Sequence, residues 1–232
     1  GLRGLEAYQS GFLISAQGHV LTVWSYVLDT DSIAVILDDG RRYPATLVGA
    51  DPRSEVAILK IEADDIQHFD PTAAVDLGPG ARVLAFSNLF GVATGDEDAS
   101  VLHGNVSAKT NLNARRGAFQ SAYQGPVYVI DAVTNNPGAA GGALTDTNGQ
   151  LVGLLGKELR NSFTNTWLNY AIPMHELLAS IDDIIAGRVS TARRDEEANK
   201  PEQPQTLDLL GITLVPDVLA KTPPFIDAVR PQ

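Results

Sequence analysis

Short apolar segments that alternate with turn residues occupy the first part of the chain. Segments of a few apolar residues bounded by Gly, Pro, Asn or Asp are typical of β-strands. The dipeptide Asp39-Gly40 separates two of them and is typical of a tight hairpin turn. This pattern predicts a first set of antiparallel strands at residues 11–14, 19–23, 32–37, 43–48 and 56–61.

A second group of apolar segments follows a polar stretch at residues 62–76. Asn148-Gly149 again provides hairpin chemistry before one of its strands. We expect surface loops at residues 91–99 and 111–125. Two consecutive groups of short strands predict an all-β fold built from two antiparallel barrels. The second group comprises residues 81–87, 104–109, 127–130, 151–155 and 168–172.

The apolar spacing changes from strand-like to helical after Pro173. A proline suits the first turn of a helix, and Gly187 suits its end. The sequence therefore predicts one C-terminal helix whose apolar stripe packs on the second barrel. The stripe consists of Leu177, Leu178, Ile181, Ile184 and Ile185.

The end of the chain has a different composition. Residues 190–206 are almost devoid of apolar side chains and contain prolines, which predicts an exposed linker. Residues 207–232 become apolar again but are too few to form a domain alone. We therefore expect a main domain at residues 1–189, followed by this linker and an incomplete domain.

Composition excludes several functions. The formal net charge of −11 argues against nucleic acid as a partner, because phosphate binding requires clustered Lys and Arg. The chain has no cysteine, so disulfides and thiol nucleophiles are excluded. No apolar run approaches the roughly 20 residues that cross a membrane. The spacing of potential ligands predicts no metal site, and we expect no cofactor.

Three ordered motifs carry the candidate chemistry. Residues 10–27 read SGFLISAQGHVLTVWSYV, residues 48–61 read VGADPRSEVAILKI, and residues 131–144 read DAVTNNPGAAGGAL. Their order and intervals resemble the three catalytic segments of HtrA/DegP-type trypsin-like serine proteases. The resemblance spans about residues 8–187 and implies a trypsin-like double six-stranded antiparallel β-barrel with a C-terminal helix.

The same resemblance implies which residues stand at the catalytic positions. The general-base histidine position holds Ser25, the orienting aspartate position holds Glu55, and the nucleophilic serine position holds Ala140. Peptide hydrolysis requires a hydroxyl, an imidazole that moves its proton and a carboxylate that orients the imidazole. A methyl group cannot attack a carbonyl, and a serine hydroxyl cannot shuttle protons near neutral pH. These residues predict a catalytically inactive homologue, a pseudoprotease.

Two alternatives retain an enzyme. In the first, the protein is an active HtrA-type endopeptidase and Ala140 is an introduced inactivating substitution, which would not explain Ser25. In the second, Thr134 or Thr145 supplies the nucleophile, although without a neighbouring histidine each is expected to be structural. None of the histidines lies at a motif position, and we expect turn or surface roles for His19, His68, His103 and His175.

The glycine-rich loop is predicted to keep a binding role without catalysis. The backbone N–H groups of Gly138, Ala139 and Ala140 would form a remnant of the oxyanion hole, since that geometry depends on glycines rather than on a hydroxyl. By analogy with the family, an open strand edge would pair with an extended peptide. The residues expected to contact this peptide are Thr134, Leu154, Leu155 and Gly156.

Two aromatic residues provide an alternative to an open site. Trp24 and Tyr26 flank Ser25, and their rings would fill the space that a histidine leaves. In that case the barrel acts only through its outer surface, or as a structural spacer for a following domain.

The tail carries a second resemblance. Residues 209–231 resemble the beginning of a bacterial PDZ domain, which commonly follows the linker in HtrA proteins. Leu210, Gly211 and Ile212 match the loop that receives a peptide carboxylate in such domains. This match implies that residues 207–232 are the start of a PDZ domain.

Together the two resemblances imply a polypeptide-binding or scaffolding protein in protein quality control of the periplasm or cell envelope. HtrA relatives commonly assemble as trimers through their N-terminal region, and Leu2, Leu5 and Tyr8 would supply such a contact here. Mixed assembly with an active relative would give the chain a regulatory role.

Overall fold

The computed structural model of the chain describes residues 8–28, 30, 32–91, 97–116, 119–136, 138–188, 212–214 and 226–229. The chain divides into two compact units, residues 1–191 and 192–232, which are treated one at a time below.

The first set of strands forms a five-stranded antiparallel sheet. Gly40, with φ of 81°, makes the predicted hairpin turn between its third and fourth strands. The polar stretch that follows contributes one backbone bond to the first strand, from Phe69 N–H to Leu13 O at 2.9 Å, rather than a sixth strand. The spatial order is β1 (Phe12–Leu13), β2 (His19–Val23), β5 (Val56–Ile61), β4 (Arg42–Asp51) and β3 (Ile33–Ile36).

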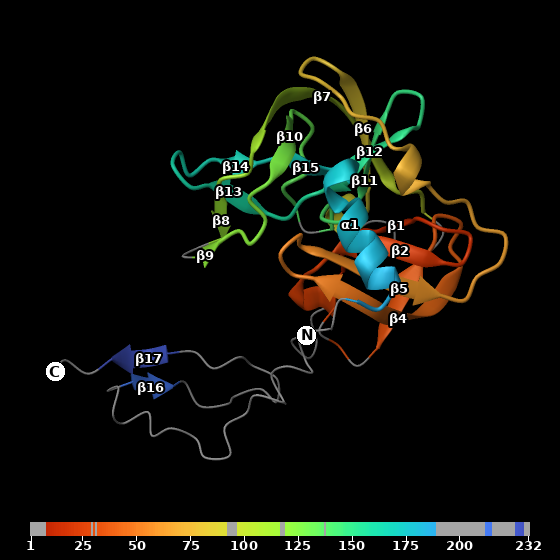
Figure 1. The fold of residues 1–232 in the computed structure, drawn as a ribbon, viewed down its shortest axis with the longest axis horizontal. Coiled ribbons are helices and arrows are strands. Elements are labelled where there is room, and N and C mark those ends of the chain that lie inside the picture. Colours follow the sequence, from red (N-terminus) through yellow and green to blue (C-terminus); the bar gives the residue numbers. More distant parts are fainter. Residues whose placement is uncertain are drawn as a thin grey trace. The chain divides into compact units, whose positions relative to one another are not determined.

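The second set closes into a six-stranded barrel (Figure 1). Gly149, with φ of 80°, turns the chain between two adjacent strands, as the Asn-Gly pair predicted. The closed barrel and the antiparallel sheet confirm the all-β fold class. The order around the barrel is β10 (Pro126–Ile130), β15 (Tyr170–Pro173), β12 (Leu151–Leu155), β11 (Ala143–Asp146), β6 (Arg82–Ser87) and β7 (Ser100–Asn111).

A small four-stranded sheet lies beside this barrel (Figure 1). Two of its strands fall within residues 111–125, so the expectation of a loop there was wrong. Both strands are short. Strand β8 pairs with a segment far away along the chain and β9 pairs with β8, so no apolar pattern reveals them. The order is β14 (Trp167–Leu168), β13 (Leu159–Asn161), β8 (Ala114–Arg116) and β9 (Phe119–Gln120).

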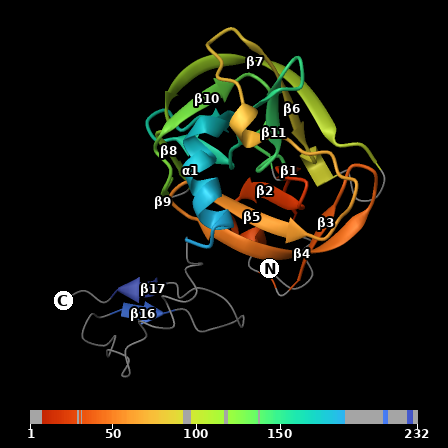
Figure 2. The ribbon, with the colours of Figure 1, turned by 45° about the vertical axis from the view of Figure 1, so that its right-hand side comes forward.

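The predicted C-terminal helix is present as α1 (Met174–Ile185). Pro173 stands at its N-cap, and Gly187 follows its end with φ of 69°, a conformation that favours glycine. The helix contacts β12 and β15 of the barrel, as predicted, and it also contacts β4 and β5 of the first sheet (Figure 2). Its buried face therefore bridges the two halves through Met174, Leu177, Ser180, Ile181 and Ile184.

Short 3-10 helices complete the first unit: η1 (Tyr26–Leu28), η2 (Pro71–Ala73) and η3 (Leu89–Gly91). Each half also has its own buried apolar cluster, and a third cluster spans both. That shared cluster combines Phe12 and Ile58 of the first sheet with Leu154 of the barrel and Leu177 of the helix. The shared core holds the two halves together, and the candidate site lies where they meet.

The described part of the second unit is one antiparallel strand pair. Strand β16 (Ile212–Leu214) pairs with β17 (Ile226–Val229). Leu210, Gly211 and the linker at residues 190–206 lie outside the described residues, as does the side chain of Ile212. The PDZ assignment stays a prediction. Across the described ranges, no helix has the length and apolarity needed to cross a membrane.

Candidate functional site

The glycine-rich loop at residues 138–142 packs against the N-terminal segment. Gly141 has φ of 88°, and a Cβ atom there would lie only 2.3 Å from Ser10 O and 2.5 Å from Thr22 Oγ1. Ser10 N–H donates to Ala140 O at 3.0 Å. Glycine is required at this position because both the backbone conformation and the close approach exclude a side chain.

Gly138 is confined in the same way. Its φ is 91°, and a Cβ atom would lie 2.3 Å from Asn88 O and from the ring of Tyr8. The Ser10 hydroxyl donates to Gly138 O and accepts from Asn88 N–H at 2.7 Å. The segment at residues 8–10 thus fixes the conformation of the loop through backbone and side-chain contacts.

The orientation of the loop's N–H groups decides what it can bind. Ala139 N–H donates to Asn136 O at 3.1 Å inside a turn, and Gly141 N–H donates to Leu155 O at 2.9 Å. Within the described residues, neither Gly138 N–H nor Ala140 N–H donates to another backbone group. Of the three amides predicted to form an oxyanion remnant, only Gly138 and Ala140 remain candidates.

Ser25, which the sequence predicts at the general-base position, is held by the N-terminal segment. Its hydroxyl donates to Gln9 Oε1 and accepts from Val27 N–H at 3.2 Å. The Gln9 amide in turn donates to Thr22 Oγ1 at 2.7 Å and to Val23 O at 2.8 Å. A neutral amide therefore binds the hydroxyl, and no member of this arrangement can accept a proton near neutral pH.

Glu55, which the sequence predicts at the orienting-carboxylate position, faces the second barrel. Its Oε1 accepts from Ser121 Oγ at 3.1 Å and from Ala122 N–H at 3.3 Å, while its Oε2 lies 3.5 Å from Lys157 Nζ. Both side chains of this ion pair are largely buried, with exposed fractions of 8% for Glu55 and 19% for Lys157. The Lys157 ammonium neutralises a carboxylate that would otherwise be paired with an imidazole.

Sequence reasoning missed Ser121 and Lys157. Neither residue belongs to a motif, and both are far from Glu55 along the chain. A buried carboxylate needs a nearby cation or several hydrogen-bond donors, so Glu55 requires such partners wherever it is buried. Only the packing of the second barrel against the first sheet identifies which residues they are.

The expected strand edge at Leu154 and Leu155 is occupied. Leu154 lies between Ala143 of β11 and Ile172 of β15, and Leu155 N–H donates to Gly142 O at 2.8 Å. The prediction that these two residues present an open edge was wrong, because closure of the barrel gives β12 a neighbour on both sides.

Gly156 marks the point where the chain leaves the barrel. Its N–H donates to Tyr170 O at 2.9 Å, and a Cβ atom there would lie 2.1 Å from the Tyr170 ring. The Tyr170 hydroxyl accepts from Lys157 N–H at 3.1 Å. Burial and the nearby Glu55 carboxylate raise the pKa of Tyr170, so its phenol stays neutral. Tyr170 thus engages the N–H groups of both Gly156 and Lys157.

Thr134 and Trp24, two further residues singled out in the sequence, contact residues that support the fold. Thr134 is buried, and its N–H donates to Asn169 Oδ1 at 2.8 Å, which holds the segment before the loop. Trp24 packs against the apolar cluster of the first sheet, together with Val20 and Leu28. The side chain of Tyr26 lies outside the described residues. The Trp24 ring therefore serves the core of the first sheet.

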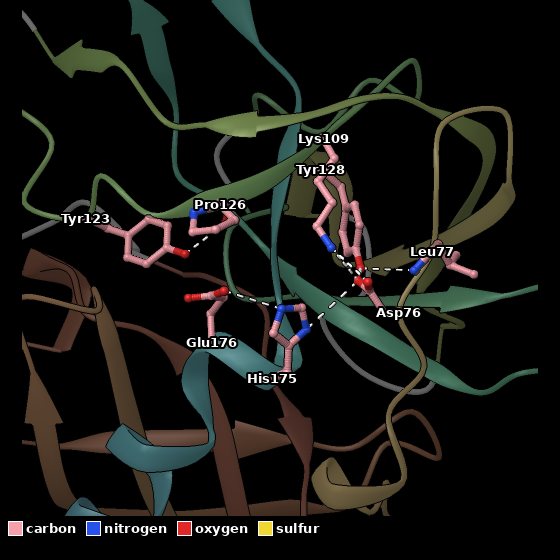
Figure 3. A network of polar contacts seen from close by, with 8 residues as sticks. All are labelled: Asp76, Leu77, Lys109, Tyr123, Pro126, Tyr128, His175 and Glu176. Carbon is pink, nitrogen blue, oxygen red and sulfur yellow. Dashed lines mark hydrogen bonds and ion pairs between the residues drawn. The ribbon is translucent and has the colours of Figure 1, made fainter.

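A separate polar network joins the barrel to the start of α1 (Figure 3). Lys109 Nζ lies 2.7 Å from Asp76 Oδ1, and the Tyr128 hydroxyl donates to the same carboxylate. His175 Nδ1 lies 4.0 Å from Asp76 Oδ1, and His175 Nε2 lies 3.3 Å from Glu176 Oε1. Hydrogen bonds from Lys109 and Tyr128 hold the pKa of Asp76 below its ordinary value. These contacts link the segment before β6 to β7, β10 and the start of α1.

Metal binding finds no support in the described ranges. They contain no group of three or more His, Asp or Glu side chains placed to hold an ion.

The barrel, the glycine-rich loop and the shared core define a trypsin-like peptidase domain. Residues 9–154 match the trypsin-like peptidase domain family, and the chain belongs to that family. A probable periplasmic serine endoprotease, DegP-like, from Pseudomonas fulva is 36% identical over 189 residues, which is 81% of this chain and 37% of that protein. A protein of the same description from Chlamydia pneumoniae is 31% identical over 207 residues, 89% of this chain and 37% of that protein.

A solved structure agrees with these relatives. The HtrA-type protease AlgW with a decapeptide has a TM-score of 0.64 and 28% sequence identity, and the match covers 84% of this chain and 60% of that one. Over most of its own length the chain is thus similar to HtrA/DegP-type proteases. The chain spans about 37% of the length of the curated relatives it matches.

Proposed function

We propose that this chain is a catalytically inactive HtrA-type homologue that binds polypeptides. The proposal rests on the groups that contact the three residues at the predicted catalytic positions. Ser25 is bonded to Gln9, Glu55 is paired with Lys157, and Ala140 has no hydroxyl. Each position that would move a proton or attack a carbonyl is occupied by a group unable to do so.

The magnitude of the loss supports an inactive protein. In the serine protease subtilisin, removal of one triad member lowers turnover by roughly 10⁴ to 10⁶, and further removals add little. Here both the base and the nucleophile are replaced. The Glu55–Lys157 ion pair also argues against a single introduced substitution at Ala140. In an active enzyme a histidine would pair with the carboxylate, so a lysine ammonium would not be needed to neutralise it.

Peptide binding is proposed from what the loop retains. The N–H groups of Gly138 and Ala140 are the remaining donors for a peptide carbonyl, and residues 156–158 leave the barrel beside them. AlgW, an HtrA-type protease similar to this chain, was solved with a decapeptide. The relatives are named as periplasmic, so we propose a place in the periplasm or cell envelope, in protein quality control.

Assembly belongs to the same proposal. A homo-trimer, or mixed assembly with an active relative, would give the binding site a regulatory role. Leu2 and Leu5 lie outside the described residues, whereas the ring of Tyr8 lies against Gly138 and Gly91. An N-terminal contact between subunits would therefore act close to the loop.

Reconstruction of the triad tests inactivity. Ala140→Ser, Ser25→His and the double variant should be assayed on casein and with a fluorophosphonate probe. The unmodified chain and Ala140→Ser are expected to show neither cleavage nor labelling, because no base is present. Cleavage by Ala140→Ser alone would establish the alternative, an active endopeptidase that carries an inactivating substitution.

A second experiment tests binding. Fluorescence anisotropy with labelled neutral peptides from casein should detect binding to the unmodified chain. Ala140→Leu adds bulk at the loop and should weaken binding, whereas Ala73→Leu places the same change on the exposed η2 segment and should not. Absence of binding to every peptide would support the other alternative, a structural spacer.

A further inference from the structure

A row of three side chains crosses the outer face of the small four-stranded sheet. Arg160 of β13 stands directly opposite Arg115 of β8 on one side and directly opposite Trp167 of β14 on the other. Directly paired residues project from the same face of a sheet. Their chain neighbours Ala114 and Leu159 are buried, so Arg115, Arg160 and Trp167 occupy the outward face, called here the Arg–Trp face.

The charges on this face are unusual for an acidic protein. Two guanidinium groups at directly opposed positions repel each other, whereas the chain as a whole carries a net charge of −11. Arg115 donates to Asn165 Oδ1 at 3.2 Å. Among the described residues, no carboxylate forms an ion pair with Arg160, and its guanidinium carbon lies 4.2 Å from the centre of the Trp167 ring. An anion placed between the two arginines would replace repulsion with charge-assisted hydrogen bonds.

Exposed aromatic surface adjoins these arginines. The exposed fractions are 51% for Trp167 and 83% for Phe163, which lies on the turn between β13 and β14. A cavity of about 730 Å³ borders the opposite face of the sheet at Ala114 and Asn161, and is lined by amide, hydroxyl and apolar side chains without a charged one. Its lining includes Thr110, Asn111, Asn113, Gln124, Asn161 and Phe163. Arg and Trp are the residue types most enriched where protein partners bind tightly.

From these observations we propose that the Arg–Trp face docks an acidic segment of a polypeptide. A carboxylate of the partner lies between Arg115 and Arg160, and an apolar partner side chain packs on Trp167 and Phe163. Charge complementarity selects this partner, because guanidinium groups form parallel hydrogen bonds with carboxylates. This site is distinct from the loop at residues 138–142 and does not depend on peptide binding there.

The test uses fluorescein-labelled decapeptides of glutamate, glutamine and lysine, with a thymidine decanucleotide as a second polyanion. The glutamate peptide should bind the whole chain, more weakly as salt increases, and the other two peptides should not. Arg115→Gln and Arg160→Gln should each weaken binding by about tenfold, as expected for loss of a charge-assisted hydrogen bond. Arg82→Gln, on an exposed strand of the barrel, is the matched control and should change affinity less than about twofold.

Further measurements keep the outcomes distinct. Near-ultraviolet circular dichroism should show that each variant remains folded, and Trp167→Phe should abolish any change in tryptophan fluorescence on binding. Binding of neutral casein peptides at the loop should be unchanged in both arginine variants, which separates this proposal from the one above. No binding of the glutamate peptide, an equal loss in Arg82→Gln, or equally tight binding of the nucleotide would each overturn the proposal.

Discussion

The ion pair between Glu55 and Lys157 should contribute measurably to stability, because it joins the two halves of the domain. Its Oε2 and Nζ atoms lie 3.5 Å apart, and both side chains are mostly shielded from water. At an effective dielectric constant of about 20, charges at that distance attract by roughly 5 kcal/mol before the cost of desolvation is subtracted. Desolvation offsets most of this attraction.

Removal of one partner is expected to cost more than the pair contributes. In Lys157→Met the Glu55 carboxylate would stay buried with only Ser121 and Ala122 as donors. We expect the free energy of unfolding to fall by about 3 kcal/mol, the effect of an uncompensated buried charge. Glu55→Gln combined with Lys157→Met removes that charge and should recover part of the loss.

Urea unfolding of both single variants and the double variant gives the coupling energy. We expect a coupling of about 1–3 kcal/mol. Lys60→Met is the matched control, since Lys60 pairs with Glu62, whose side chain is 91% exposed, and its loss should cost about 1 kcal/mol or less. Additive effects of the two single substitutions, within about 0.5 kcal/mol, would refute the interpretation of Lys157 as the counter-ion of Glu55.

Three other predictions concern the loop, the helix and the polar network. Gly141→Ala should lower the melting temperature far more than Gly149→Ala, because a Cβ at Gly141 meets Ser10 O at 2.3 Å whereas nothing lies within 4 Å at Gly149; similar losses would contradict this. Burial opposes ionisation of Asp51, but hydrogen bonds led by Ser180 outweigh it and lower its pKa, so the carboxylate stabilises the fold above about pH 4 and less as pH falls. Ser180→Ala should therefore cost about 1–2 kcal/mol at neutral pH, with the difference in unfolding free energy shrinking in acid. Burial and the Asp76 hydrogen bond raise the pKa of Tyr128 to about 12, so its neutral phenol contributes stability that is present below about pH 10 and lost as pH rises through 12. Alkaline titration followed by tyrosinate absorbance should lose a late component in Tyr128→Phe, and loss of an early component would argue against the raised pKa.

Local chemistry accounts for the parts of the fold that could be predicted. The hairpin turns at Gly40 and Gly149 and the helix between Pro173 and Gly187 depend on backbone conformations of single residues, which short stretches of sequence encode. The assignment of Ser25, Glu55 and Ala140 to the catalytic positions also comes from contiguous motifs, and it stays a prediction.

Pairing between distant segments decided the rest. The sheet formed by β8, β9, β13 and β14 has no local signal, and closure of the barrel gave Leu154 and Leu155 neighbours on both sides. The choice of Lys157 as the partner of Glu55 also depends on how the two halves pack. The sequence by itself predicted that the catalytic groups are replaced. Only the tertiary structure decided what those replacements contact, since contacts between residues far apart in the chain arise from packing and not from local pattern.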